Sequence, residues 1–190
     1  MIKNKKDYKH YISIELKQPS SKFQKLKELL CTTTKSYIKA LRKLEYHYNN
    51  SGIIHKILSF VYFLKWHHLS VKLGIYIPKN VCKEGLTLYH YGSIVVNPDC
   101  KIGKNCCIQN NVNIGVNVGE TKAPVIGDNV YIGPGAIIFG DIYIADNCYI
   151  GANAVVTKSI NEPFSVAVGA PAKVIKTEKE NWWTKERLNR

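Results

Sequence analysis

The sequence predicts a mainly β fold, a parallel β-helix, and two observations carry this prediction. Isoleucine or valine recurs every six residues between positions 96 and 156, and one gap of twelve keeps the phase. Small residues, most often glycine, follow many of these positions. A period of six fits neither a helix nor a single strand, but it fits a chain that forms a short strand, turns a corner and repeats. The aliphatic series is Val96, Ile102, Ile108, Ile114, Ile126, Ile132, Ile138, Ile144, Ile150 and Val156.

A second apolar series stands four residues after most members of the first and is expected to face inward too. Three of its members are cysteines, which act there as compact hydrophobes. The chain has six cysteines without C-x-x-C spacing, so we expect neither disulfides nor zinc, and a reducing cytoplasm fits best. The second series is Cys100, Cys106, Val112, Val130, Ala136, Ile142, Cys148 and Ala154.

Residues 1–74 are predicted to form a helical N-terminal segment. Apolar residues recur at intervals of three and four from Ser21, so a helix is expected there, capped by Ser20 or Ser21 and ended near Gly52. A second helix is expected over 53–73, closed by Gly74. Its apolar stripe is flanked by lysines, so it packs on the adjoining domain or a partner subunit, or lies in a membrane interface. The stripe is Ile54, Ile57, Leu58, Val61, Leu64, Leu69 and Leu73.

The β-helix domain is expected over 75–176, followed by a tail over 177–190. Residues 115–125 interrupt the repeat and are expected to form a loop that protrudes from one corner. A short helix over 179–188 carries Trp182 and Trp183, which are expected to pack on the domain or on a neighbouring subunit. The earliest coils must be irregular, because steps of six back from Val96 reach polar residues and a proline.

The net charge of +13 is unevenly placed. Residues 1–75 hold 15 Lys/Arg against 4 Asp/Glu, whereas residues 76–176 hold 8 against 7. Such a basic block favours an anionic membrane surface or an acidic glycan, unless it is simply a solvated helical surface. No nucleic-acid motif accompanies it, so no nucleic-acid partner is expected. The N-terminus lacks a signal-peptide pattern and the longest apolar run is eight residues, so a cytoplasmic protein is expected, with peripheral contact at the inner membrane.

His90 is the histidine of the β-helix region and the candidate catalytic residue. Its imidazole titrates near neutrality and can accept the proton of an alcohol, which is a poor nucleophile at neutral pH. Strict six-residue phase would instead bury His90, but Leu86 and Leu88 are better inward candidates in that strand. A zinc site needs several coil histidines, so no metal is expected.

Five segments resemble the left-handed β-helix (hexapeptide-repeat) acyltransferases, in particular the serine acetyltransferase branch and its relatives in bacterial polysaccharide gene clusters. They are LGIYIP (73–78), GLTLYHYGSIVVN (85–97), APVIGDNVYIGPGAIIFGDIYI (123–144), IGANAVVTKSI (150–160) and VGAPAKVI (168–175). The resemblance implies a left-handed helix, a homotrimer with active sites between subunits, and direct acetyl transfer from acetyl-CoA to a hydroxyl with His90 as general base. It implies cofactor contacts at Asn113, Gly115, Gly133, Pro134, Ala152, Lys158, Pro171 and Lys173.

The acceptor site departs from the serine acetyltransferases that the chain resembles. Their catalytic histidine directly follows an aspartate, and a second aspartate orients it; these positions hold Tyr89 and Ile75 here. An arginine–histidine pair that contacts the amino-acid acceptor aligns with Lys122 and Ala123. Near His90 the chain offers tyrosines, which suit a sugar ring or packing at a subunit interface. These tyrosines are Tyr76, Tyr89 and Tyr91.

Because the acceptor site differs from that of the serine acetyltransferases, we expect one function and keep two alternatives. The expected activity is O-acetylation of a sugar hydroxyl in a bacterial capsule or O-antigen, or in its precursor. The first alternative is a serine O-acetyltransferase of cysteine biosynthesis. The second is a non-catalytic trimeric scaffold that binds a glycan or a protein.

Overall fold

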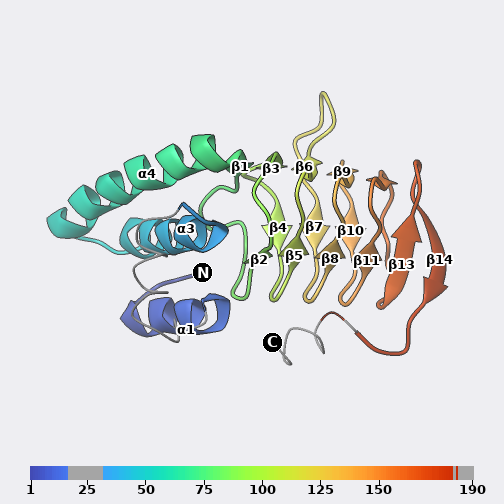
Figure 1. The fold of residues 1–190 in the computed structure, drawn as a ribbon, viewed down its shortest axis with the longest axis horizontal. Coiled ribbons are helices and arrows are strands. Elements are labelled where there is room, and N and C mark those ends of the chain that lie inside the picture. Colours follow the sequence, from blue (N-terminus) through green and yellow to red (C-terminus); the bar gives the residue numbers. More distant parts are fainter. Residues whose placement is uncertain (17–31, 182, 184–190) are drawn as a thin grey trace.

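The computed structural model describes residues 1–16, 32–181 and 183. Its helices α1 (Lys5–Glu15), α3 (Thr34–Tyr48) and α4 (Ile53–Leu73) form a block at one end of a stack of short strands (Figure 1). Asn4 caps α1 by accepting the N–H groups of Lys6 and Asp7. Gly74 ends α4 in the left-handed conformation, with φ of 68°.

The helical pattern that begins at Ser21 does not give one helix. The helix α3 starts at Thr34, because the Thr33 hydroxyl accepts the N–H of Ser36 at 3.2 Å and so forms an N-cap. The proposed caps Ser20 and Ser21 lie outside the described residues. The helix expected over 53–73 is present with those bounds as α4.

The strands stack into three sheets that form the faces of a prism. Parallel pairing orders them β1-β3-β6-β9-β12 (face A), β4-β7-β10 (face B) and β2-β5-β8-β11-β13 (face C), with β14 antiparallel on β13. The strands are β1 Ile75–Tyr76, β2 Thr87–Leu88, β3 Ile94–Val96, β4 Lys101–Ile102, β5 Cys107–Ile108, β6 Asn113–Gly115, β7 Val125–Ile126, β8 Tyr131–Ile132, β9 Ile137–Phe139, β10 Tyr143–Ile144, β11 Tyr149–Ile150, β12 Val155–Val156, β13 Ser165–Val168 and β14 Lys173–Thr177.

The aliphatic residues of the six-residue repeat fill the prism, as predicted. All ten are at most 2% exposed, and the second apolar series is buried as well. Register explains the ladder, since Ile108 pairs with Ile132 and Ile132 pairs with Ile150 on face C. Leu86 and Leu88 are the inward residues of the early coil, whereas His90 is exposed. The prediction that His90 lies outside the core is therefore confirmed.

A buried arginine joins the helical block to the first coil. The Arg42 guanidinium is 0% exposed and forms ion pairs with Glu15 at 2.6 Å and Glu45 at 2.8 Å. It also donates to the main-chain oxygens of Cys82 at 2.9 Å and Lys83 at 2.8 Å. Each of these partners satisfies a polar group that would otherwise be buried alone. The charge of Arg42 thus fixes α1 and α3 against the β-helix.

After β14 the described part of the tail, residues 178–181 and 183, turns back and packs on face C (Figure 1). Trp183 is 1% exposed, and its Nε1–H donates to the Asn105 oxygen at 3.2 Å. The Asn181 amide donates to the Asn129 oxygen at 3.0 Å. Of the two packing partners expected for Trp183, this chain's own β-helix is the one observed. Trp182 and most of the helix expected over 179–188 lie outside the described residues.

The stripe expected on α4 does not form one packed face. Trp66, Leu69 and Leu73 are buried, whereas Ile54 and Leu64 are 68% and 51% exposed. The predicted stripe spans too wide an arc to pack on one side, and Leu69 and Leu73 are its buried members. No helix in the described ranges has the length and apolar content needed to span a bilayer.

Candidate active site

His90 follows β2 and stands at the corner where the chain passes from face C to face A. Its side chain is exposed, and its ring centroid lies 6.4 Å from that of Tyr89. The segment after it is tied to the end of α4, because the N–H of Gly92 donates to the Leu73 oxygen at 3.0 Å. His90 thus sits where the helical block meets the first coil.

Corners of successive coils stack into one edge of the prism, which we call the C/A edge. Gly135 donates to the oxygen of Asn110 at 3.0 Å, and Asn153 donates to that of Pro134 at 2.9 Å. The edge ends in the turn 169–172 between β13 and β14. Neighbouring strands lie about 4.8 Å apart, so four steps put roughly 19 Å between the His90 corner and this turn. An elongated ligand laid along the C/A edge would reach both.

Four of the predicted cofactor residues lie on the C/A edge. Pro134 and Ala152 are exposed and follow one another from coil to coil, and Pro171 is exposed in the final turn. Gly133 is buried, and a Cβ there would lie 2.8 Å from the backbone nitrogen of Ala152. Close stacking of the coils therefore explains Gly133 without any ligand.

Of the other four predicted cofactor residues, Lys173 directly follows the final turn of the C/A edge, and the rest lie on face A or at its opposite border. Gly115 and Lys158 stand at the opposite border of face A, which we call the A/B edge, because β7 and the Ile160 bridge of face B follow them. Asn113 lies on face A between the two edges, exposed. Lys173 starts β14, exposed and opposite Val168. A single chain does not bring the eight residues together.

The loop expected over 115–125 is present between β6 and β7 and rises beside the A/B edge (Figure 1). Lys122 forms an ion pair with Asp141 at 2.9 Å, with both side chains largely exposed. A hydrogen bond and the charge of Asp141 raise the pKa of Lys122. The Asn117 amide donates to the Glu120 carboxylate at 3.0 Å inside the loop.

The three tyrosines predicted to lie near His90 have different surroundings. Tyr91 is 70% exposed, and Tyr76 is 44% exposed with its ring 5.6 Å from that of Trp66. Tyr89 is half-buried and packs edge-on against Trp183. Tyr91 and Tyr76 are thus open to a ligand, whereas Tyr89 is part of the contact with the tail. The sequence contained both partners of that contact but no signal that the tail returns to the first coil.

Two of the aligned acceptor positions are buried and apolar, and a third, Lys122, is paired with Asp141. Ile75 is 1% exposed and pairs with Ile94 inside the first coil, and Ala123 is 7% exposed. Residues 1–16, 32–181 and 183 hold no group of three or more histidine, cysteine, aspartate or glutamate side chains suited to a metal ion.

Comparisons with known proteins agree with this architecture. Residues 123–158, less than half of the chain, match the family model described as "Bacterial transferase hexapeptide (six repeats)". No match was found among curated proteins. Among solved structures, a Neisseria gonorrhoeae serine acetyltransferase in complex with serine is 25% identical, with a TM-score of 0.61 over 90% of this chain and 66% of that chain.

Two further serine acetyltransferase structures are similar. That of Brucella abortus strain S19 is 21% identical, with a TM-score of 0.71 over 93% of this chain and 72% of that chain. The soybean enzyme complexed with serine is 22% identical, with a TM-score of 0.61 over 89% and 66%. The chain thus spans about two thirds of the length of these proteins. The fold fits a left-handed β-helix, and the hexapeptide repeat over 123–158 is that of bacterial transferases.

Proposed function

We propose that this protein is an acetyl-CoA-dependent O-acetyltransferase in which His90 is the general base. The observation that carries the proposal is the exposed position of His90 at one end of the C/A edge, whose other end is the turn 169–172. A thioester laid along this edge could present its carbonyl carbon beside the imidazole while the rest of acetyl-CoA contacts Pro134, Ala152 and Pro171.

In this reaction the His90 imidazole accepts the proton of the acceptor hydroxyl. The alcohol oxygen forms a bond to the thioester carbonyl carbon and gives a tetrahedral oxyanion. The carbon–sulfur bond then breaks, and the CoA thiolate takes the proton held by His90. A positioned general base typically contributes a factor of about 10² to 10⁴ in rate.

The proposed assembly is a homotrimer with each active site between two subunits. It would explain why the cofactor candidates divide between two edges: the C/A edge of one prism and the A/B edge of a second copy could meet across an interface. Face C is covered by the tail through Trp183. Face A carries an outward row in which Tyr76 pairs with Val95, and Asn113 pairs with Ile137. We therefore assign face A and its edges to the contacts between copies.

The comparisons favour serine as the acceptor over the sugar that the sequence analysis put first, because the similar structures are serine acetyltransferases. Serine is therefore the first acceptor to test. A specific observation keeps a sugar hydroxyl, in a capsule or O-antigen precursor, as the second candidate. Ile75 and Ala123 are buried apolar residues where the resemblance would place acceptor-site polar groups, and Tyr91, next to His90 in the chain, and Tyr76 of the first coil are exposed.

The test is release of CoA thiol from acetyl-CoA on addition of L-serine, and mass spectrometry of a glycan panel incubated with acetyl-CoA. His90→Gln should lower acetyl transfer by about 10²- to 10⁴-fold while leaving thermal stability and acetyl-CoA binding intact. The matched control is His10→Gln, an exposed histidine of α1. Undiminished transfer by folded H90Q would refute the mechanism, and acetyl-CoA binding without transfer to any acceptor would favour the scaffold alternative.

A further inference from the structure

The outer face of α4 is largely apolar and unpartnered, and it also carries the exposed His67 and His68. Ile53, Phe60 and Val71 are 71%, 62% and 73% exposed. Their spacing of seven and eleven residues puts them on one face, about 20° apart around the helix at most. The same side of α4 also exposes Ile54, Ile57, Val61 and Leu64.

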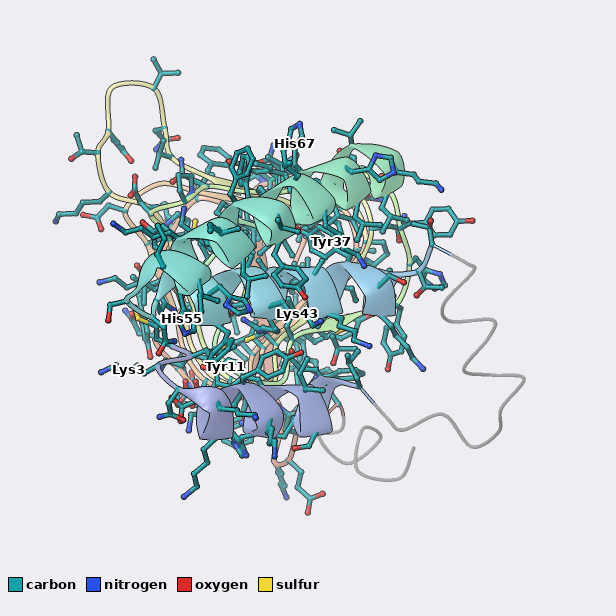
Figure 2. The ribbon with its side chains drawn as sticks, turned by 90° about the vertical axis from the view of Figure 1, so that its left-hand side faces the viewer. Lys3, Tyr11, Tyr37, Lys43, His55 and His67 are labelled. Atoms are coloured by element: carbon teal, nitrogen blue, oxygen red, sulfur yellow. The ribbon has the colours of Figure 1, made fainter. Side chains whose placement is uncertain are left out.

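This exposed face is opposite the one that packs. Trp66, Leu69 and Leu73 are buried, and α4 contacts α3 and β1 through that side. In Figure 1, α4 lies at one outer side of the block and α1 at the other, with α3 between them. Figure 2 shows His67 pointing outward from α4, whereas Tyr37 lies on the α3 side of the helix. A helix that only covered the domain would be polar on its outer face.

Positive charge borders the apolar row and no negative charge accompanies it. The 21 residues of α4 contain no aspartate or glutamate. Lys56 lies on one side of the row and Lys65 and Lys72 on the other, all three exposed. They belong to the segment 1–75, which holds 15 Lys/Arg against 4 Asp/Glu.

The apolar row with lysines at its borders favours one kind of binding partner for this surface. A second copy of α4 packed face to face would set lysines against lysines with no carboxylate on either helix to pair with them. An anionic bilayer surface offers an apolar layer for the row and phosphates for the lysines, whose long stems let the charge reach the headgroups while the row is buried. Exposed apolar side chains gathered on one face of a helix and bordered by lysines are typical of an interaction site.

We propose that α4 lies in the surface of a membrane containing anionic lipids, with Ile53, Phe60 and Val71 buried at the headgroup–acyl boundary and Lys56, Lys65 and Lys72 at the phosphates. The helix lies along the surface rather than across it, consistent with the absence of a spanning helix in the described ranges. This inference does not depend on the proposed acetyl transfer, and it would hold the β-helix beside the bilayer.

The experiment is flotation of the full chain with vesicles of phosphatidylcholine alone and of phosphatidylcholine with 30% phosphatidylglycerol, at about 0.1 M and 0.5 M salt. Binding is expected with the anionic vesicles at low salt. Phe60→Ser with Leu64→Ser should abolish it, and Lys56→Glu with Lys65→Glu and Lys72→Glu should weaken it by roughly a hundredfold or more. The control is Val174→Ser with Ile175→Ser, two exposed apolar residues of β14, which should bind like the parent.

Circular dichroism and light scattering of each variant accompany the flotation, so a misfolded variant is recognised, and Phe60→Tyr then replaces the double change as a milder test. Absence of binding by the parent protein would overturn the proposal. So would binding that neither the apolar nor the lysine variants reduce. A different outcome is a parent protein that shows no vesicle binding, while the variant with Phe60→Ser and Leu64→Ser forms smaller oligomers than the parent does. That result would assign the surface to contacts between copies.

Discussion

The Trp183 ring packs edge-on against the ring of Tyr89, with centroids 5.7 Å apart and planes inclined at 82°. Tyr89 directly precedes His90, and the two rings lie 6.4 Å apart. Trp183 is held from both ends, because its Nε1–H donates to Asn105 and its main-chain N–H donates to the Tyr149 hydroxyl at 3.3 Å. The tail therefore contacts the segment that carries the proposed base.

Trp183→Ala should release the tail and lower the stability of the first coil. Truncation of a buried aromatic residue costs about 3–5 kcal/mol, and detachment of the tail would keep the loss near the lower bound. Trp183→Phe keeps an aromatic ring but loses part of the buried indole volume together with the hydrogen bond to Asn105, so a smaller loss of about 1–3 kcal/mol is expected. Thermal denaturation and limited proteolysis of the tail measure both effects. Equal melting of W183A and the parent protein would mean that the contact does not stabilise the fold.

Arg42→Met should be strongly destabilising, because it leaves the carboxylates of Glu15 and Glu45 buried without their cation. Burial alone would lower the pKa of Arg42, but the charges of Glu45 and Glu15 raise it well above its ordinary value, so the arginine is charged in the folded protein. Breaking such a pair from one side typically costs about 3–5 kcal/mol.

Urea denaturation measures this loss, and neutralising the stranded carboxylates should recover part of it. The informative comparison is Arg42→Met alone against Arg42→Met combined with Glu15→Gln and Glu45→Gln. Full recovery is not expected, since Glu15 also accepts the N–H groups of Gly85 and Leu86 at 3.0 and 3.1 Å. If the triple variant is less stable than R42M, uncompensated charge is not the source of the loss.

The β-helix was predictable from sequence because its signal is local and repeated. Each coil has an equivalent inward position that requires an apolar side chain. Ile102, Ile126 and Ile144 occupy this position in successive coils. The end of α4 was predictable for a related reason, since Gly74 adopts a conformation that favours glycine. The start of α3 was not, because the helical period continues across Thr33 and the cap depends on which hydroxyl meets a free N–H.

The candidate site was only partly predictable. His90 could be found because it is the one histidine in the sequence of the β-helix region. The six-residue repeat is also irregular around it, so His90 was not expected to point inward. The Arg42 contacts and the Trp183–Tyr89 contact join residues 40 and more than 90 positions apart, and no periodic pattern encodes such pairs. The division of the cofactor candidates between two edges was also hidden, because sequence order does not show which corner a residue occupies.

Asn129→Ala should destabilise the β-helix more than Asn129→Gly. Asn129 has φ of 58°, where asparagine and glycine are tolerated and alanine is strained by about 1–2 kcal/mol. Its side chain also belongs to a ladder, accepting from Asn105 and donating to Asn147, each at 3.1 Å. Both variants lose the ladder, so their difference in unfolding free energy reports the strain of alanine less the greater unfolded-state entropy of glycine, about 0.4–1 kcal/mol. An N129A that is more stable than N129G by that amount would show that the left-handed conformation costs alanine nothing at this corner.

Acidification should destabilise the helical block through His47. Its Nδ1 lies 3.1 Å from that of His55, and its ring stacks on Tyr62 with centroids 5.4 Å apart. Burial, then the charges of His55 and Lys43, lower the pKa of His47 from its ordinary 6.5. The unfolded chain therefore binds this proton at a higher pH than the folded one does. The stabilising contribution is complete above about pH 6.5 and is lost as the pH falls toward the lowered pKa.

Melting temperatures at about pH 7.5 and 5.5 test this linkage, because the range spans the ordinary histidine pKa. His47→Gln should show a smaller drop than the parent protein, since glutamine can still hydrogen-bond to His55 but takes up no proton. His10→Gln, at an exposed position of α1, should retain the full drop. An equal drop in H47Q and the parent would place the acid sensitivity elsewhere, and the contact between His47 and His55 would then be packing without a role in the response to pH.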